Sequence, residues 1–397
     1  MKENNFKKSK ITKRVEHRKK VTAIGLFLSC AFVSIIVLVA FLILLIPDKQ
    51  MSEKENRVLA QKPVLTLSSI TSGKFMKDFE SYLTDQFPLR DQIISFKTFV
   101  DRSVGKKEEN GVYIGKNGFL FEQQTEYDKD SVEKITSAVV KFAKENKKLK
   151  KAFLLSPNSS YVLGGLMPKG YEPESQKEQL DKIKELVEPS GISWVDCVKV
   201  FDAQEDKTGL FYRTDHHWTT KAAYLAFKEL AGTFGISLKN AKFKLYSVSD
   251  SFQGTLASSS GVGNSTDEIQ ICIAQKPAVS YVVNYESSNK KTATLFDKDK
   301  LNQKNQYEVF LGGNYDKVII STSADTDNTL LLFKDSYANC MIPMLTPFFA
   351  KIVVIDPRYF SDSLDGIMKE YNFTHVLFLY NLNTFLADTS LVDALES

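Results

Sequence analysis

The sequence predicts an α/β protein with a mostly parallel sheet, attached to one N-terminal transmembrane helix. Three features of the 397-residue chain support this prediction. Residues 21–46 contain no charged side chain. From residue 132 onward, short apolar runs alternate with amphipathic segments. Residues 236–328 interrupt this alternation with a β-rich stretch that is also rich in Gly and Ser.

The uncharged run 21–46 is long enough to cross a bilayer as a helix, at a rise of about 1.5 Å per residue. The preceding tail, residues 1–20, carries nine Lys or Arg against two Glu. The positive-inside rule therefore predicts a cytoplasmic N-terminus and an extracytoplasmic body, in a single-pass protein of the cell membrane. A cleaved signal peptide is the alternative, but its apolar stretch would be shorter and would end in small residues, whereas this one ends at Leu45-Ile46-Pro47.

The charge balance of the exported part differs from that of the whole chain. Nine of the 52 Lys and Arg residues and two of the 48 Asp and Glu residues lie in the first twenty positions, which leaves 43 basic and 46 acidic residues. This slightly acidic body predicts no nucleic-acid partner. The four cysteines, at positions 30, 197, 272 and 340, are too few and too scattered for a disulfide framework.

Between the membrane and the body, residues 47–72 are polar with little periodicity and predict a stalk. The extracytoplasmic domain then spans residues 73–397. It begins with two predicted helices: one over 75–83, and a second that Pro88 separates from the first and starts, and that runs to about Ser103. Residues 110–121 follow as two short apolar runs around a Lys-Asn-Gly turn, which predicts a hairpin.

The remaining elements follow the pattern of buried strands alternating with helices. The predicted strands are 152–155, 192–195, 330–333, 352–355 and 376–380, and the predicted helices are 176–186, 221–234, 337–345 and 363–371. The insertion, about 236–328, contains the segment 252–264, which we interpret as a flexible loop and a candidate lid.

Histidine chemistry outside the membrane must come from His216, His217 or His375, because His17 lies in the tail. In an extended segment, residues i and i+2 point to the same side, so Asp215 can hold the Nδ1 proton of His217 and leave Nε2 free as a base. A half-buried, hydrogen-bonded structural histidine is the alternative.

Ser336 follows the apolar strand 330–333 at the point where a helix is predicted to begin. A serine there presents its hydroxyl at the carboxyl edge of the sheet, and its backbone N–H is directed toward a developing oxyanion. The sequence therefore offers Ser336 as a nucleophile. A purely structural helix cap is the alternative, because Asp and Ser are both favoured at that position.

Taken together, these residues resemble a known family. Asp215-His216-His217-Trp218 is similar to the signature of the DHHW family, and with Asp335-Ser336 it resembles the alginate O-acetyltransferase group of SGNH-hydrolase-like proteins. Supporting stretches are residues 87–91, 110–121 and 307–314. The resemblance implies a three-layer sandwich, with Asp-x-His upstream of the serine, and a triad of Ser336, His217 and Asp215.

The sequence departs from the family pattern before the nucleophile, where Lys334 stands in place of the usual Gly. The asparagine that completes the oxyanion hole of SGNH enzymes has two candidate counterparts, Asn381 and Asn158, each of which could instead be a turn residue. Three further residues are candidates for substrate contact. Arg213 could bind an anionic sugar or form an ion pair, and Tyr337 and Trp218 could stack on a sugar or pack in the core.

The resemblance implies an O-acyltransferase, most simply an O-acetyltransferase, that acts on a cell-surface or exported polysaccharide without a cofactor. Acyl-CoA is cytoplasmic, so a multi-spanning membrane acyltransferase partner is implied as the acyl donor. The same triad would serve a carbohydrate acetyl esterase. A non-catalytic glycan-binding component of an export complex is the alternative of a different class. A metal-dependent phosphoesterase is disfavoured, since the body offers only His375 beyond the His216–His217 pair, and we expect no metal.

Overall fold

The computed structural model describes residues 2–52, 57–171, 175–263 and 265–397. Its chain divides into two compact units, with the division between Lys97 and Thr98. The first unit contains α1 (Lys2–Leu45), β1 (Met51–Ser52), β2 (Arg57–Val58), α2 (Leu67–Thr71) and α3 (Lys74–Asp85), and α4 (Arg90–Ser103) crosses the division.

Helix α1 contains the predicted apolar span. Its segment Lys20–Leu45 has a mean hydropathy of 3.1 and no part of its most apolar stretch is buried by the rest of the structure. The described residues contain no other helix of that length and composition. Such a helix is typical of a single-pass membrane anchor or of a signal sequence. The predicted stalk also has local structure, because β1 pairs with β2 and Thr66 caps α2 through its side chain.

The second unit is built around an eight-stranded sheet with the order β11-β10-β12-β14-β13-β15-β6-β7. Its five strands β14, β13, β15, β6 and β7 are mutually parallel, and β12, β10 and β11 continue the sheet in antiparallel pairs. The strand bounds are β6 Lys150–Ser156, β7 Ser193–Val195, β10 Tyr281–Tyr285, β11 Lys290–Thr292, β12 Lys317–Thr322, β13 Thr329–Lys334, β14 Lys351–Ile355 and β15 His375–Asn381.

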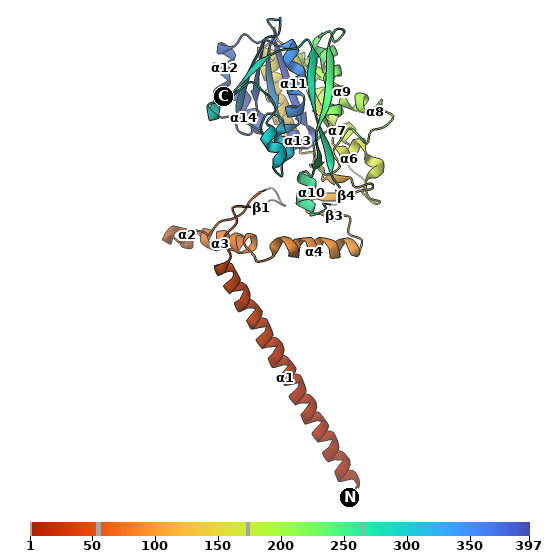
Figure 1. Cartoon of the computed structure of the whole chain (residues 1–397), viewed down its shortest axis with the longest axis vertical. Helices are drawn as coiled ribbons and strands as arrows, with labels where there is room; N and C mark the ends of the chain where they lie inside the picture. Colours follow the sequence, from red (N-terminus) through yellow and green to blue (C-terminus); the bar gives the residue numbers. More distant parts are fainter. Residues whose placement is uncertain (1, 53–56, 172–174, 264) are drawn as a thin grey trace. The chain divides into compact units, whose positions relative to one another are not determined.

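Helices cover both faces of this sheet, because alternate residues of each strand point to opposite sides. Leu330 and Leu332 join one core cluster with residues of α9, and Leu331 and Phe333 join another with residues of α5 and α7. Figure 1 shows α8 and α9 on one side of the sheet and α12 and α14 on the other. The helix bounds are α5 Lys129–Glu145, α6 Ser159–Val162, α7 Gln176–Val187, α8 Cys197–Asp202, α9 Thr220–Phe234, α10 Thr255–Ser260, α11 Ile342–Leu345, α12 Leu364–Glu370, α13 Leu382–Ala387 and α14 Ser390–Glu396. The predicted three-layer α/β class is confirmed.

Strand β13 occupies the position where the chain changes direction across the sheet. The next strand, β14, lies on one side of β13, and the strand after that, β15, lies on the other. Open α/β sheets bind ligands at such a switch point, beyond the carboxyl ends of the strands. The residues that follow β13 are therefore placed where a site is expected.

Two small sheets complete the unit. The predicted hairpin is present as β4 (Val112–Ile114) and β5 (Leu120–Glu122), with β3 (Glu108–Glu109) paired to β4. Strands β8 (Lys242–Phe252) and β9 (Asp267–Lys276) form a separate antiparallel pair. The stretch 236–328 is thus only partly an insertion, because β10, β11 and β12 extend the main sheet.

Two local expectations are wrong. The helix expected over 337–345 is a 3₁₀ helix at Ser336–Cys340 followed by the short α11 and another 3₁₀ turn at Thr346–Phe348. Pro343 and Pro347 lack the N–H that a continuous helix needs. The candidate lid 252–264 contains α10, whose Leu256 and Ala257 are buried against the hairpin residues Val112 and Leu120. Asn264 lies outside the described residues.

Replacing Phe378 tests the packing of the sheet face that α5 covers. Its fully buried ring contacts those of Phe333, Phe142 and Phe153 at centroid distances of 5.2, 6.1 and 5.6 Å. We expect Phe378→Ala to lower the free energy of unfolding by about 3–5 kcal/mol, because it leaves a cavity. Urea unfolding of the full chain in detergent, followed by tryptophan fluorescence, measures this. The control Leu186→Ala, at a side chain 41% exposed, should cost less than about 1 kcal/mol, and equal losses would contradict the packing described.

Candidate active site

The turn after β13 is fixed by the buried carboxylate of Asp335. This carboxylate accepts the Tyr337 N–H at 2.9 Å and the Asn381 N–H at 2.8 Å, which ties the turn to the end of β15. Burial raises the pKa of Asp335, although these N–H donors and the charge of Arg358 act in the opposite direction. The next residue, Ser336, is partly exposed. Asp335 therefore holds the serine at the carboxyl edge of the sheet.

His217 comes from a tight reversal of the chain between Phe211 and Trp218, which form an antiparallel bridge. Within it, Asp215 accepts the backbone N–H of His217 at 3.0 Å, and its carboxylate lies 2.5 Å from His217 Nδ1. The second carboxylate oxygen accepts the N–H of Thr255 at 2.8 Å and its hydroxyl at 3.1 Å. The carboxylate is thereby fixed from two segments.

Gly254 allows this approach. A Cβ atom at that position would lie 2.2 Å from the Asp215 carboxylate, which is closer than real atoms come. Because the side chain of Asp215 is itself buried and fixed, a larger residue at 254 would displace it.

The side chains of Ser336, His217 and Asp215 form one hydrogen-bonded chain. His217 Nε2 lies 2.7 Å from Ser336 Oγ, and His217 Nδ1 faces Asp215. This arrangement holds the imidazole in the tautomer that leaves Nε2 able to accept a proton. Chemically, the group can deprotonate a serine hydroxyl and stabilise the imidazolium that results.

Aromatic and imidazole rings enclose His217. The ring of Tyr307 stacks on it with a centroid distance of 3.7 Å and an interplanar angle of 13°, and the Tyr307 hydroxyl donates to the Ser336 carbonyl at 3.1 Å. On another side, His216 lies at 3.9 Å and bonds through Nδ1 to the Thr255 hydroxyl at 2.7 Å. The sequence placed Tyr307 in a stretch that supports the family resemblance and Thr255 in the candidate lid, but no local spacing indicated that either side chain contacts the histidines.

This enclosure sets the protonation of the site. Burial and the neighbouring His216 lower the pKa of His217 to about 4, although Asp215 acts in the opposite direction. Burial would raise the pKa of Asp215, but the nearby His216 and His217 and the hydrogen bonds from His217 and Thr255 outweigh it and hold that pKa well below its usual range. At neutral pH the group is thus a neutral imidazole beside a carboxylate.

The two candidate asparagines are hydrogen-bonded to each other. Asn381 Oδ1 accepts the N–H of Asn383 at 2.9 Å, so its Nδ2 faces Asn158 Oδ1, also at 2.9 Å. The side-chain nitrogen of Asn158, Nδ2, takes no part in this hydrogen bond. Within the described ranges it makes no hydrogen bond to protein, so it is available to a ligand.

The two aromatic candidates for sugar stacking are buried, which contradicts that reading. Trp218 is fully buried and donates its indole N–H to the Tyr337 carbonyl at 2.8 Å. Tyr337 is also buried, and its hydroxyl bonds to the His216 carbonyl. Both rings support the segment that carries His217, and neither has a free face for a sugar.

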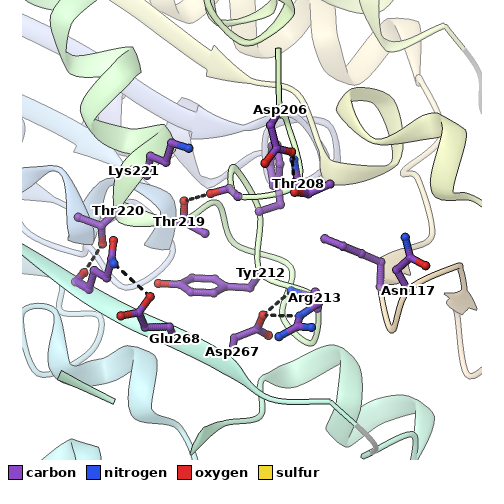
Figure 2. A pocket seen from close by; sticks show the side chains of 14 residues that line it. Asn117, Asp206, Thr208, Tyr212, Arg213, Thr219, Thr220, Lys221, Asp267 and Glu268 are labelled. Atoms are coloured by element: carbon purple, nitrogen blue, oxygen red, sulfur yellow. Dashed lines mark hydrogen bonds and ion pairs between the residues drawn. The ribbon is translucent and has the colours of Figure 1, made fainter. Parts of the chain in front are cut away.

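Arg213 lines a pocket of about 500 Å³ beside this segment. Figure 2 shows its guanidinium turned toward Asp267. Its Nη2 donates to the Thr266 carbonyl at 2.6 Å, and its Nε lies 3.5 Å from the Asp267 carboxylate. Arg213 is therefore ion-paired, and the lining residues of the pocket do not include Ser336.

Asp215, His216 and His217 also bring potential metal-ligand atoms within 4.8 Å of one another. Both ring nitrogens of His217 are hydrogen-bonded, so a metal would have to displace either Asp215 or Ser336. His375, the remaining histidine of the body, lies in β15 and bonds to Thr374. The expectation of no metal stays a prediction.

Comparison with known proteins shows the family of the chain. The family model of the SGNH hydrolase-like domain of acetyltransferase AlgX matches residues 112–313, which is just over half of the 397 residues. The match includes Asp215 and His217 and ends before Ser336. No curated protein matches the chain.

Several solved structures share the fold. A DHHW family protein from Eubacterium siraeum DSM 15702 is 20% identical, with a TM-score of 0.56, over 72% of this chain and 96% of its own. Bacillus cereus PatB1, solved with a sulfonyl adduct, is 16% identical with a TM-score of 0.58, over 69% of this chain and 96% of its own. The predicted family resemblance is confirmed. The chain belongs to the family of SGNH hydrolase-like domains of the AlgX acetyltransferase type.

Proposed function

We propose that this protein is a membrane-anchored, extracytoplasmic O-acetyltransferase that acts on hydroxyl groups of a cell-surface or exported polysaccharide. Ser336 is the nucleophile, His217 the general base and Asp215 the residue that orients His217. The observation that carries the proposal is the 2.7 Å contact between Ser336 Oγ and a His217 whose other nitrogen is held by Asp215. Membership of an acetyltransferase domain family supports the same reaction class.

The first half of the reaction loads the enzyme. His217 Nε2 takes the Ser336 proton as Oγ bonds to the carbonyl carbon of the acyl donor, and the carbonyl electron pair moves to oxygen. The tetrahedral intermediate then collapses, the donor's leaving group takes the proton from His217, and an acetyl ester remains on Ser336. A positioned base of this kind contributes about 10² to 10⁴ in rate.

The second half transfers the acetyl group. A glycan hydroxyl gives its proton to His217 and attacks the acyl carbon, and the intermediate collapses to release the acetylated glycan while Ser336 regains its proton. The free Nδ2 of Asn158, oriented by Asn381, is suited to hold the oxyanion in both halves. If water replaces the glycan hydroxyl, the same residues give an acetyl esterase.

The proposed extracytoplasmic location of the domain implies that a membrane partner must deliver the acyl group. With α1 as an uncleaved anchor and the basic tail in the cytoplasm, the domain faces away from the cytoplasmic acyl-CoA pool. The proposal therefore includes a multi-spanning membrane acyltransferase that delivers the acyl group, and no cofactor within this chain. A non-catalytic glycan-binding role is the second candidate, favoured by Lys334 at the position of the family's usual Gly.

Replacing the nucleophile tests the chemistry. We expect Ser336→Ala to lower kcat/KM for a generic acetyl ester by about a thousandfold or more, because no acyl-enzyme can form. In cells, the same variant should abolish the O-acetyl content of the surface polysaccharide, as measured by mass spectrometry. The matched control is Ser258→Ala, which removes a buried hydroxyl that makes no hydrogen bond to any residue the structure describes. Normal acetylation in the Ser336 variant would favour the glycan-binding role.

The pH profile tests the assignment of His217. The base is active when neutral, and an imidazole is neutral above its pKa, so the low pKa of about 4 predicts activity that stays level down to acidic pH. We expect the pH at which kcat/KM has fallen by half to lie well below the ordinary histidine pKa of about 6.5. Initial rates with a neutral acetyl ester measure this, with circular dichroism as the control for folding. A half-point at or above about 6.5 would show that His217 is not held in this environment.

The orientation of the chain is testable by labelling. In intact cells, a membrane-impermeant maleimide should react with Asn240→Cys, an exposed position of the domain. The matched variant Ser9→Cys should react only after permeabilisation, because the tail is cytoplasmic. Loss of the Ser9 label from the mature protein would indicate a cleaved signal sequence, and the opposite labelling pattern would reverse the topology.

A further inference from the structure

Arg358 lies in the turn that follows β14, and Ser336 lies in the turn that follows the neighbouring strand β13. In the parallel pair of β13 and β14, Phe333 is opposite Ile355, and Ser336 and Arg358 each lie three residues beyond that pair. Neighbouring strands are about 4.8 Å apart. On the other side of β13, Phe378 is opposite Phe333, and Asn381 is again three residues further. The carboxyl ends of these parallel strands therefore bring the turn of Ser336, the turn of Arg358 and the end of β15 to the same edge of the sheet.

The guanidinium is held in place by a buried carboxylate. Arg358 donates to Asp356 through Nε at 2.8 Å and through Nη2 at 2.6 Å, which is the two-pronged geometry that fixes a guanidinium plane. Asp356 is fully buried and also accepts a hydrogen bond from Lys334 Nζ at 3.0 Å. Lys334, itself fully buried, donates to Asn314 at 2.8 Å.

Lys334, Asp356 and Arg358 carry two positive charges and one negative charge, and the buried Asp335 carboxyl group lies near enough to act on both cations. Lys334 and Asp356 balance each other, and Arg358 adds a cation whose side chain is 28% exposed. A buried ion pair is weak evidence for stability, because desolvation offsets most of the attraction. A buried lysine directly before the Asp-Ser turn therefore suggests a role other than stability. By donating to Asp356, Lys334 helps to hold the carboxylate that orients Arg358.

The outer edge of the guanidinium is available. Within the described ranges, Nη1 of Arg358 forms no hydrogen bond and no ion pair, and it is not sealed in the interior. The charge of Arg358 also reaches the site, since it acts against protonation of both His217 and Asp335, although burial has the larger influence on the pKa of each.

We propose that Arg358 binds the negatively charged oxygen that forms when Ser336 attacks the acyl carbonyl, and that Asp356 and Lys334 are positioning residues for Arg358. The inference rests on the proposed function. As the Ser336 Oγ–carbon bond forms, the carbonyl π pair becomes a lone pair on oxygen and the serine proton passes to His217. Arg358 stabilises that oxygen until the pair returns and the leaving group departs with the proton.

The same guanidinium could instead bind a carboxylate of an acidic sugar, which is the other source of a negatively charged oxygen at this edge. A neutral acetyl ester distinguishes the two, because it carries no carboxylate and still generates the oxyanion. The test therefore uses p-nitrophenyl acetate with the full chain in detergent. Arg358→Gln and Asp356→Asn are compared with Ser336→Ala and with the control Lys351→Gln, at the opposite end of β14.

We expect Arg358→Gln to lower kcat about 100-fold with little change in KM, as removal of an oxyanion donor does. The acid half-point of its pH profile should also move upward, because a cation that opposes protonation of His217 is lost. Asp356→Asn should lower kcat in the same direction, and Lys351→Gln should not. Added guanidinium ion should partly restore kcat in Arg358→Ala, which a merely structural residue would not allow.

The outcomes separate this inference from the proposed function. If Ser336→Ala is inactive while Arg358→Gln retains full kcat and the same pH profile, the nucleophile stands and the role of Arg358 is wrong. If Arg358→Gln changes only KM, and only for acidic glycans, the guanidinium binds substrate carboxylate and the oxyanion role is also wrong. If Ser336→Ala is itself fully active, the proposed function fails first.

Discussion

The site depends on a single hydrogen bond between two segments 119 positions apart, from Ser336 Oγ to His217 Nε2. Each partner is also fixed by its own surroundings. The serine is placed by β13 and by the Asp335 carboxylate, which binds the turn to β15. The histidine is placed by Asp215 and by the stacked ring of Tyr307. Because Tyr307 also bonds to the Ser336 carbonyl, one side chain holds both partners.

The buried carboxylates of Asp215 and Asp267 are both matched with hydrogen-bond donors, and these bonds hold the segment that carries His217. Asp215 accepts hydrogen bonds from His217 and Thr255. Asp267 accepts the N–H groups of Arg213 and Thr214, which fixes the segment just before Asp215. A half-satisfied network in this place would cost stability and let the imidazole turn away from the serine. Residues 252–263 contribute to this support through Thr255 and through the buried residues of α10.

Several features were predictable because they follow from local patterns. The apolar run 330–333 indicated a buried strand, and a serine at its end is necessarily at the sheet edge. The i, i+2 spacing of Asp215 and His217 indicated their contact. The insertion was less predictable, because antiparallel strands such as β12 have the same short apolar pattern whether they join the main sheet or a separate hairpin.

Other features depend on distant contacts that a sequence does not reveal. Thr255 looked like part of a Ser-rich loop, yet it bonds to Asp215, 40 positions away. The aromatic side chains of Trp218 and Tyr337 suggested stacking on a sugar ring, but both rings are buried in the core. Lys334 looked like a departure from the family pattern. In the structure, buried Lys334 bonds to Asp356, which in turn bonds to Arg358. No local spacing in the sequence could indicate this series of contacts.

The central claim is that His217 activates Ser336 as a nucleophile, and a covalent probe tests it most directly. A sulfonyl fluoride forms a stable adduct with an activated serine. The measurement is the intact mass of the full chain after treatment, followed by peptide mapping, for the unaltered protein and for His217→Ala. We expect one sulfonyl group on Ser336 in the unaltered protein and almost none in the variant. No adduct on Ser336, or equal modification of both proteins, would contradict it.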